Sequence, residues 1–200
     1  PQLVIIDPKL LETLNQREFS NGMAEVIKTA AIRDATLFDA LEAAILMKRP
    51  WDLTDVIKRC VHIKGHIVAL DEKEANLRML LNFGHTIGHA IEAAYGFETF
   101  LHGEAVSIGM SVLTRVSERL AFTEAGAAGR IIAILKALSL PTDLPSERLE
   151  EVLHHILYDK KAMGESNQVV ILEHIGQAKH MMLPYSMLVK EIERDINDII

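Results

Sequence analysis

The stretch from residue 78 to residue 92, RMLLNFGHTIGHAIE, constrains the fold of this chain more than any other. Its polar side chains recur at alternating steps of four and three residues, and they are Arg78, Asn82, His85, His89 and Glu92. Side chains three and four apart are neighbours on a helix, so these five are expected in one stripe. Most other positions are apolar. The pattern predicts a helix that is buried on most sides, and it favours a functional site over a surface helix with incidental histidines.

The composition is that of a globular protein with one core. The chain has 200 residues, 49% of them hydrophobic and 24% charged, which is enough for a single domain. Its net charge of −7 is spread along the chain, which argues against nucleic acid or an anionic membrane as a partner. We see neither a bilayer-spanning apolar run nor a signal peptide. Cys60 is the only cysteine, so we expect a reducing, cytoplasmic location.

Hydrophobic periodicity predicts a mainly α fold, with many helices and a few short strands. Ser20 or Asn21 is expected to cap the helix that contains residue 25, Asp52 to cap a later helix, and Gly96 to end the polar-striped one. The chain has no Gly-x-Gly-x-x-Gly turn after a strand, so nothing in it is expected to cradle a dinucleotide. Helices are expected over residues 8–15, 22–32, 38–47, 56–70, 78–95, 101–120, 123–138, 146–159 and 186–200, a single strand over 3–6, and a hairpin over 168–172 and 179–183.

Histidines at positions i and i+4 suggest a metal site. A catalytic zinc site usually takes three protein ligands, so His85 and His89 alone do not make one. His102 is a candidate for a further ligand, and so is Glu25, an acid inside an apolar helical pattern. Such a set suits zinc, with cobalt or iron as alternatives. Spacing leaves two choices open, because His89 competes with His85 and Glu104 competes with Glu25.

A second group of candidates is cationic. Several lysines and one arginine fall in apolar settings, and together they favour an anionic ligand such as a phosphate or a carboxylate. The alternative for each residue is an apolar stem on the core with its charged head in water. The members of the group are Lys28, Lys64, Arg78, Lys160 and Lys161.

Three blocks of the sequence resemble the signature blocks of 3-dehydroquinate synthase, in the same order and at comparable separations. They are NGMAEVIK at 21–28, LNFGHTIGHAIE at 81–92 and LHGEAV at 101–106. They match the C-terminal, metal-binding half of that family. The resemblance implies that residues 1–200 form one helical domain and that a Rossmann-like NAD-binding domain, with no counterpart here, precedes it. Residues 1–7 resemble the strand that crosses between the two domains.

The resemblance also implies roles for individual residues. Glu25, His85 and His102 match the family's zinc ligands, while His89 matches a histidine that transfers protons near the substrate phosphate. Lys28, Lys64, Arg78 and Asn82 match residues that hold the substrate, Lys28 and Lys64 as part of the catalytic set and Arg78 at the carboxylate. The Asp159-Lys160-Lys161 motif matches one that supplies a phosphate-binding lysine, for which we choose Lys161 over Lys160.

The implied reaction converts the sugar phosphate 3-deoxy-D-arabino-heptulosonate 7-phosphate to 3-dehydroquinate, a step of the shikimate pathway that leads to aromatic amino acids. Phosphate is released, and NAD and zinc are the cofactors. The family is usually homodimeric. This chain alone is expected to be inactive. The alternatives are a related cyclase that makes 2-deoxy-scyllo-inosose or a valiolone, and a non-catalytic metal-binding module. Arg78, Asn82 and His89 favour 3-dehydroquinate synthase, because the related cyclases need not grip a carboxylate.

Overall fold

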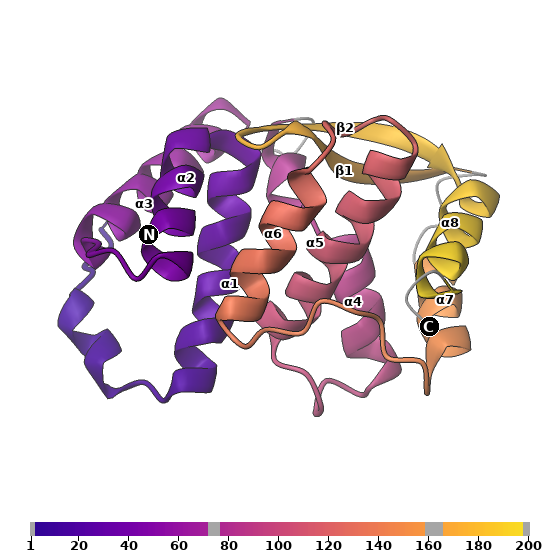
Figure 1. Ribbon diagram of the computed structural model, residues 1–200, viewed down its shortest axis with the longest axis horizontal. Coiled ribbons are helices and arrows are strands. Elements are labelled where there is room, and N and C mark those ends of the chain that lie inside the picture. Colours follow the sequence, from indigo (N-terminus) through magenta and orange to yellow (C-terminus); the bar gives the residue numbers. More distant parts are fainter. Residues whose placement is uncertain (1–2, 72–76, 159–165, 198–200) are drawn as a thin grey trace.

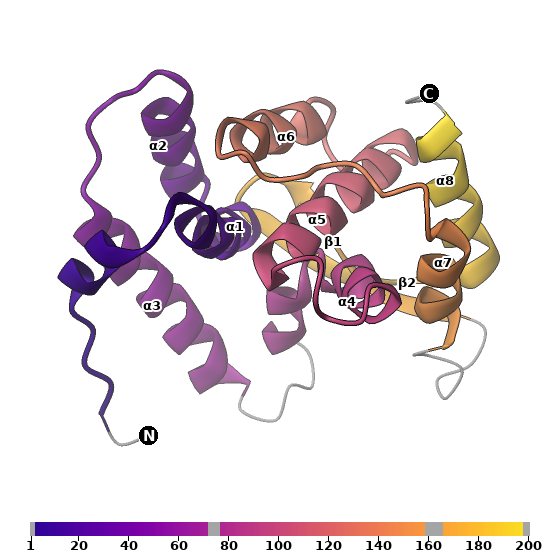
Figure 2. The same cartoon turned by 90° about the horizontal axis from the view of Figure 1, so that it is seen from below.

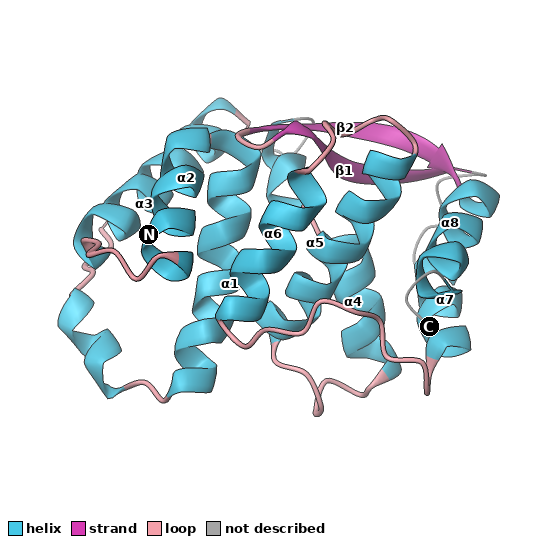
Figure 3. Ribbon diagram, viewed as in Figure 1, coloured by secondary structure: helices cyan, strands magenta, loops and turns pink. Residues whose placement is uncertain are grey.

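The computed structural model describes residues 3–71, 77–158 and 166–197. Helices dominate it, and the strands form one hairpin (Figure 3), so the predicted mainly α fold is confirmed. The elements are the 3₁₀ helix η1 (Pro8–Thr13), helices α1 (Gln16–Arg33), α2 (Ala35–Leu46) and α3 (Leu53–Leu70), the 3₁₀ helix η2 (Leu77–Asn82), helices α4 (His85–Ala94), α5 (His102–Arg119), α6 (Ala127–Ala137) and α7 (Leu149–Tyr158), strands β1 (Ser166–His174) and β2 (Gln177–Pro184), and helix α8 (Tyr185–Asn197).

Helix α5 is the centre of the domain. It packs against α1, α4, α6 and α8, and most of its side chains are buried. Figure 2 looks along α1, with α4 and α5 beside it, and Figure 1 has the hairpin lying across one end of these helices. The small polar residues of α5 are buried without being left unsatisfied. Ser111 and Thr114, for example, donate hydrogen bonds to the carbonyl oxygens of Ser107 and Met110 one turn earlier.

Glycines allow α4 and α5 to approach closely. A Cβ atom on Gly109 would lie 2.0 Å from the carbonyl oxygen of Gly84, and one on Gly88 would lie 3.2 Å from the backbone nitrogen of Val106. Gly84 also has φ +79°, a conformation that other residues seldom adopt. Contacts this tight leave no room for side chains, so the backbone of α5 lies directly against the start of α4.

The predicted continuous helix over residues 78–95 is therefore wrong. The segment begins as the 3₁₀ helix η2, breaks at the left-handed Gly84, and restarts as α4 at His85. The physical reason is the contact just described, because the chain must turn at Gly84 to reach α5. Arg78 and Asn82 precede the break, whereas His85, His89 and Glu92 follow it.

Several other predicted boundaries need correction. Helices α2 and α3 begin three residues before their predicted starts, and α7 begins three residues after its own. Helix α1 begins at Gln16, six residues before the predicted start, and the side chain of Asn15 caps it, so Ser20 and Asn21 are not caps. Residues 8–15 hold only the 3₁₀ helix η1. Helix α6 begins at Ala127, not 123, because the Thr123 hydroxyl donates a hydrogen bond to the Leu172 carbonyl oxygen instead of entering a helix.

The strand predicted over residues 3–6 is absent. These residues have no regular structure and are exposed, and Figure 2 has the segment running outward from η1. A β-branched run needs a neighbouring strand to satisfy its backbone groups, and the only sheet among the described residues is the β1–β2 hairpin.

Other local predictions are confirmed. Asp52 caps α3, accepting a hydrogen bond from the backbone N–H of Thr54. The C-terminal hairpin is antiparallel, with Val169 opposite Met181, and its turn contains Gly176 at φ +91°. In the parts of the chain that the structure describes, no helix combines the length and apolar character that a membrane crossing needs.

Candidate metal centre

Three helices supply one cluster of donor atoms. Glu25 lies in the middle of α1, while His85 and His102 are the first residues of α4 and α5. The α4–α5 glycine contacts bring the two histidines together, with ring centroids 5.1 Å apart. A second close contact joins α5 to α1, because a Cβ atom on Gly103 would lie 2.1 Å from the carbonyl oxygen of Asn21. The cluster is thus a product of helix packing.

The donor atoms converge on Oε1 of Glu25. Nε2 of His85 and Nε2 of His102 each lie 3.8 Å from that oxygen. Donors around a tetrahedral zinc ion stand about 3.3–3.4 Å apart when its bonds are about 2.0–2.1 Å long. The observed separations exceed that spacing by a few tenths of an ångström. The three groups therefore have separations close to those of a metal ligand set.

Oε1 of Glu25 is the strongest sign that a cation fits here. The side chain as a whole is 41% exposed, yet Oε1 is buried and has no hydrogen-bond partner. A buried, unpaired carboxylate oxygen costs free energy, and a bound cation would remove that cost. The other oxygen, Oε2, accepts a hydrogen bond of 2.7 Å from Nζ of Lys28. One carboxylate oxygen is satisfied, and the other is aimed into the cluster.

Both histidines present Nε2 to the cluster. Nδ1 of His85 lies 3.1 Å from the carbonyl oxygen of Phe83. A carbonyl oxygen only accepts, so the proton sits on Nδ1 and Nε2 keeps its lone pair. Burial, with the nearby charge of Lys28, holds the pKa of His85 well below its ordinary value. His85 is therefore neutral at neutral pH, in the form that binds metals.

Lys28 is the buried member of the predicted cationic set. It is 4% exposed, and burial lowers the pKa of its ammonium although the ion pair with Glu25 opposes that shift. Its predicted contact is with substrate, and the structure adds a contact with a candidate metal ligand. Lys64, in contrast, is exposed, and with Glu25 and Cys60 it lines a shallow hollow of about 200 Å³ between α1 and α3.

The backbone around His102 is fixed by residues far away in sequence. The backbone N–H of Gly103 donates a 2.6 Å hydrogen bond to Oδ1 of Asn21. Glu104 accepts from the backbone N–H of Leu101 and forms a two-bond ion pair with Arg17 at the start of α1. Glu104 is thus occupied in joining two helices, and it is not in the cluster with His85. Spacing had left it as a competitor of Glu25.

His89 lies beside the cluster, one turn after His85 on α4. It is exposed, and its ring centroid is 5.2 Å from that of His85 and 6.0 Å from that of His102. His89, Glu92 and His102 form a second group with metal-like separations. His89 therefore lies at the rim of the donor cluster, and Glu92 contacts His102 there. The proton-transfer role of His89 stays a prediction.

The remaining predicted residues lie on η2 or beyond the described residues. Arg78 is half-buried, and its backbone N–H donates to the carboxylate of Asp71. Asn82 is exposed and lines a small hollow with Thr86 and residues of β1. Lys160 and Lys161 fall in the stretch 159–165, outside the residues that the structure describes.

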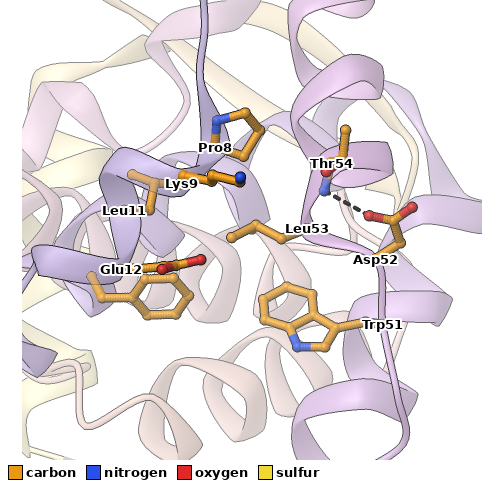
Figure 4. Close-up of a pocket in the computed structure, with 9 residues that line it drawn as sticks. Pro8, Lys9, Leu11, Glu12, Trp51, Asp52, Leu53 and Thr54 are labelled. Carbon is orange, nitrogen blue, oxygen red and sulfur yellow. Dashed lines mark hydrogen bonds between the residues drawn. The ribbon is translucent and has the colours of Figure 1, made fainter.

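Another hollow, of about 600 Å³, lies between η1 and the start of α3 (Figure 4). Pro8, Lys9 and Leu11 approach it from one side, and Trp51 and Leu53 from the other. It contains none of the predicted site residues and none of the described groups with metal-like separations.

The fold matches part of solved sugar-phosphate cyclases. A 2-epi-5-epi-valiolone synthase from Streptomyces hygroscopicus subsp. jinggangensis, solved with NAD+ and Zn2+ bound, superposes with a TM-score of 0.83 at 26% identity, over 98% of this chain and 55% of that one. A 2-deoxy-scyllo-inosose synthase complexed with carbaglucose-6-phosphate, NAD+ and Co2+ shares the fold, with a TM-score of 0.75 at 20% identity, over 94% of this chain and 54% of that one. The chain thus has the fold of about half of such a cyclase.

The family follows from the sequence comparisons. The family model described as 3-dehydroquinate synthase C-terminal matches residues 22–162, so the chain belongs to that family. A 3-dehydroquinate synthase from Clostridium botulinum is 44% identical over 179 residues, 89% of this chain and 51% of that protein. One from Caldanaerobacter subterraneus is 46% identical over 164 residues, 80% of this chain and 46% of that protein. The chain spans about half the length of these curated relatives.

Proposed function

We propose that this chain is the metal- and substrate-binding half of a 3-dehydroquinate synthase. That enzyme is a carbon–oxygen lyase that converts 3-deoxy-D-arabino-heptulosonate 7-phosphate to 3-dehydroquinate and releases phosphate. The observation that carries the proposal is the convergence of Glu25, His85 and His102 in a chain of this family. Residues 1–200 act as a single domain, and an N-terminal NAD-binding domain completes the enzyme, in line with relatives about twice as long.

In the proposed site, Glu25, His85 and His102 hold zinc, with cobalt as the alternative. When bound, the metal would supply Lewis acidity at a substrate hydroxyl, and NAD would accept the hydride from the carbon that bears that hydroxyl. Lys28 orients the Glu25 carboxylate through its 2.7 Å contact with Oε2. The burial of His85 keeps its imidazole neutral. These two residues thus prepare the donor set before any ligand arrives.

Proton transfer falls to His89 in this proposal. Its exposed imidazole lies at the edge of the donor cluster, within reach of a substrate seated there. Once a ring alcohol has become a ketone, the neighbouring C–H is acidic, and His89 or the substrate's own phosphate takes that proton as phosphate leaves. Lys64, Arg78 and Asn82 orient the substrate by its polar groups, Arg78 at the carboxylate, and Lys161 or Lys160 binds the phosphate.

Metal binding tests the site directly. The wild-type chain, dialysed against zinc and then freed of excess, should retain one zinc per chain, and Glu25→Gln should lose it. Gln is the matched change because it keeps the shape of the side chain and removes the ligand's charge. Glu98→Gln is the control, since that carboxylate is exposed in the loop between α4 and α5. Unchanged zinc content in Glu25→Gln would refute the ligand assignment.

The proposed catalysis is tested by supplying an NAD-binding domain. The NAD-binding domain of a close relative, supplied in cis or in trans, should give phosphate release from 3-deoxy-D-arabino-heptulosonate 7-phosphate when NAD and zinc are present. The chain alone should give none. If a folded, zinc-loaded assembly releases no phosphate, the enzyme proposal fails, and a non-catalytic metal-binding module becomes the better description.

A related cyclase is the second candidate function, and the TM-score of 0.83 to the valiolone synthase favours it. The two candidates differ in the carboxylate of the substrate. Arg78→Ala in the restored enzyme should reduce kcat/KM for the carboxylated substrate by about 10²-fold or more if a charged contact of about 3 kcal/mol is lost. It should change turnover of a sugar phosphate without a carboxylate far less. Equal losses on both would favour the related cyclase.

The predicted homodimer and cytoplasmic location form part of the same proposal. The family resemblance supports both. Sedimentation of the restored enzyme, which should give twice the mass of one polypeptide, would check the dimer, and a fluorescent fusion in cells would check the location.

A further inference from the structure

We infer that Glu92 is a positioning residue for the metal ligand His102, an inference that rests on the metal centre proposed above. Oε1 of Glu92 lies 3.1 Å from Nδ1 of His102. The side chain of Glu92 is only 11% exposed, whereas that of His102 is 44% exposed. A largely buried carboxylate on the last part of α4 therefore holds a more exposed imidazole on the first turn of α5.

The contact determines which nitrogen of His102 can bind a cation. An ionised carboxylate only accepts hydrogen bonds, so the proton of the neutral ring sits on Nδ1. Nε2 then keeps its lone pair, and this is the nitrogen that lies 3.8 Å from Oε1 of Glu25. His85 reaches the same state through a neutral partner, the carbonyl oxygen of Phe83. The two histidines are thus oriented alike but by groups of different charge.

The charge of Glu92 matters because Lys28 already neutralises the ligand carboxylate. Lys28 lies 2.7 Å from Glu25, so this pair adds no net charge to the cluster. The histidines are neutral ligands. Among the described residues that contact the donor set, Glu92 is the one that brings an uncompensated negative charge. A carboxylate behind a ligating imidazole also makes the ring a stronger donor. Glu92 should therefore raise the affinity for a divalent cation by both orientation and charge.

The same atoms have a competing use. Glu92, His89 and His102 themselves have metal-like separations, so Glu92 as a direct ligand of a second cation is the alternative. The two uses exclude each other at Nδ1 of His102, since a hydrogen bond needs a proton there and a metal needs the lone pair. A count of bound metal per chain separates them.

The experiment compares wild type with Glu92→Gln and Glu92→Leu, with Glu98→Gln as the control for charge. Glu98 is exposed, in the loop that joins α4 to α5. Zinc affinity is measured by competition with a chelator, and zinc per chain by atomic emission. We expect one zinc per chain. Glu92→Gln should bind about 10-fold more weakly and Glu92→Leu up to about 100-fold more weakly, while Glu98→Gln stays within about 2-fold.

The ring of His102 gives a readout that general destabilisation would not change. In metal-free protein, ¹⁵N-labelled histidine reports which nitrogen carries the proton. Wild type should have it on Nδ1. Glu92→Gln keeps an oxygen acceptor, so it should keep that proton position while losing affinity. Glu92→Leu should shift the proton toward Nε2. If Glu92→Leu does not fold, the Gln variant, checked by circular dichroism, still tests the charge.

Each outcome supports or overturns a distinct statement. If wild type binds no zinc, or Glu25→Gln leaves binding unchanged, the metal centre itself fails. If wild type binds one zinc and both Glu92 variants match it in affinity and in proton position, the centre stands and the positioning role is overturned. Two zinc ions per wild-type chain, one of them lost in Glu92→Gln, would make Glu92 a direct ligand.

Discussion

Replacing Gly109 by alanine tests whether glycine contacts between α4 and α5 build the site. The added Cβ would lie 2.0 Å from the carbonyl oxygen of Gly84 and 3.1 Å from the backbone nitrogen of Gly88. An ordinary carbon–oxygen contact is more than 1 Å longer, and both neighbours are backbone atoms that no rotamer change can move. The helices must separate by about 1 Å, which breaks contacts along both of them.

The magnitude follows from two opposing effects. Overpacking a close-packed interior costs about 1–3 kcal/mol, and a clash with rigid backbone lies at the upper end or beyond. Alanine is favoured over glycine within a helix by about 1 kcal/mol, which offsets part of that cost. We therefore expect a net loss of about 2 kcal/mol or more. For a chain of this size, that lowers the melting temperature by about 4–8 °C.

Gly129→Ala is the matched control. Gly129 is in helix α6, is exposed, and would place its Cβ with no atom within 4 Å. The same chemical change should therefore stabilise the protein by about 0.5–1 kcal/mol. Thermal unfolding followed by circular dichroism, on metal-free protein, measures both variants. Zinc affinity is measured beside it, because separation of α4 from α5 should also move His85 away from His102. If Gly109→Ala melts like Gly129→Ala, or keeps wild-type zinc affinity, the close contact does not set the site.

Four further predictions concern other parts of the molecule. Asp34 caps α2 and pairs with Arg59. Burial raises the pKa of the Asp34 carboxyl, but the hydrogen bonds that it accepts from Arg59 and from the end of the helix outweigh burial and hold that pKa below its ordinary value. Asp34→Asn keeps a capping side chain and should cost about 1 kcal/mol in urea unfolding at pH 7. Because the folded pKa is depressed, that difference should shrink as pH falls below about 4, whereas a constant difference would exclude the ion pair. Burial raises the pKa of Cys60 to about 11, so its alkylation by iodoacetamide should be slow at pH 7 and rise about tenfold per pH unit up to about pH 10; a rate like that of free cysteine would contradict the burial. Thr123→Val leaves the carbonyl oxygen of Leu172 without its 2.7 Å donor and should lower the free energy of unfolding by about 1–3 kcal/mol, unless water replaces the hydroxyl, in which case no change is measured. Removing zinc with a chelator should lower the melting temperature by about 5–10 °C relative to protein held at a free zinc concentration of about 100 times Kd, and Glu25→Gln should abolish the difference.

The parts of the fold that sequence predicts well are those set by local chemistry. Apolar periodicity locates the helices, Asp52 caps the helix that follows it, and Gly176 marks the hairpin turn. The parts that it misses are set by distant residues. The chain breaks at Gly84 because α5 lies against it, and Gly109, the residue responsible, is 25 positions away. The run over residues 3–6 looks like a strand, but strand residues need a partner, and no strand among the described residues pairs with it.

The candidate site, too, could be predicted from the sequence only in part. Residue types alone propose Glu25, the histidines and Lys28, but spacing cannot choose between His85 and His89, because both lie on one face of α4. Distance to Oε1 of Glu25 favours His85, and it arises from three helices packing together. Glu92 escaped assignment for the same reason, since its partner His102 is on another helix.

The closest backbone approaches at glycines in the described part of the chain, at Gly109 and Gly103, lie next to the donor set. Two of the three pairs of donors depend on such a glycine contact: Gly109 against Gly84 brings His85 to His102, and Gly103 against Asn21 brings His102 to Glu25. A ligand set must be held to within about 0.5 Å to favour one metal geometry, and flexible side chains between the helices would not give that precision. Backbone against backbone does, because neither side can change rotamer. The glycines are therefore as much a part of the proposed metal centre as the ligands, although none of them touches the position of a metal.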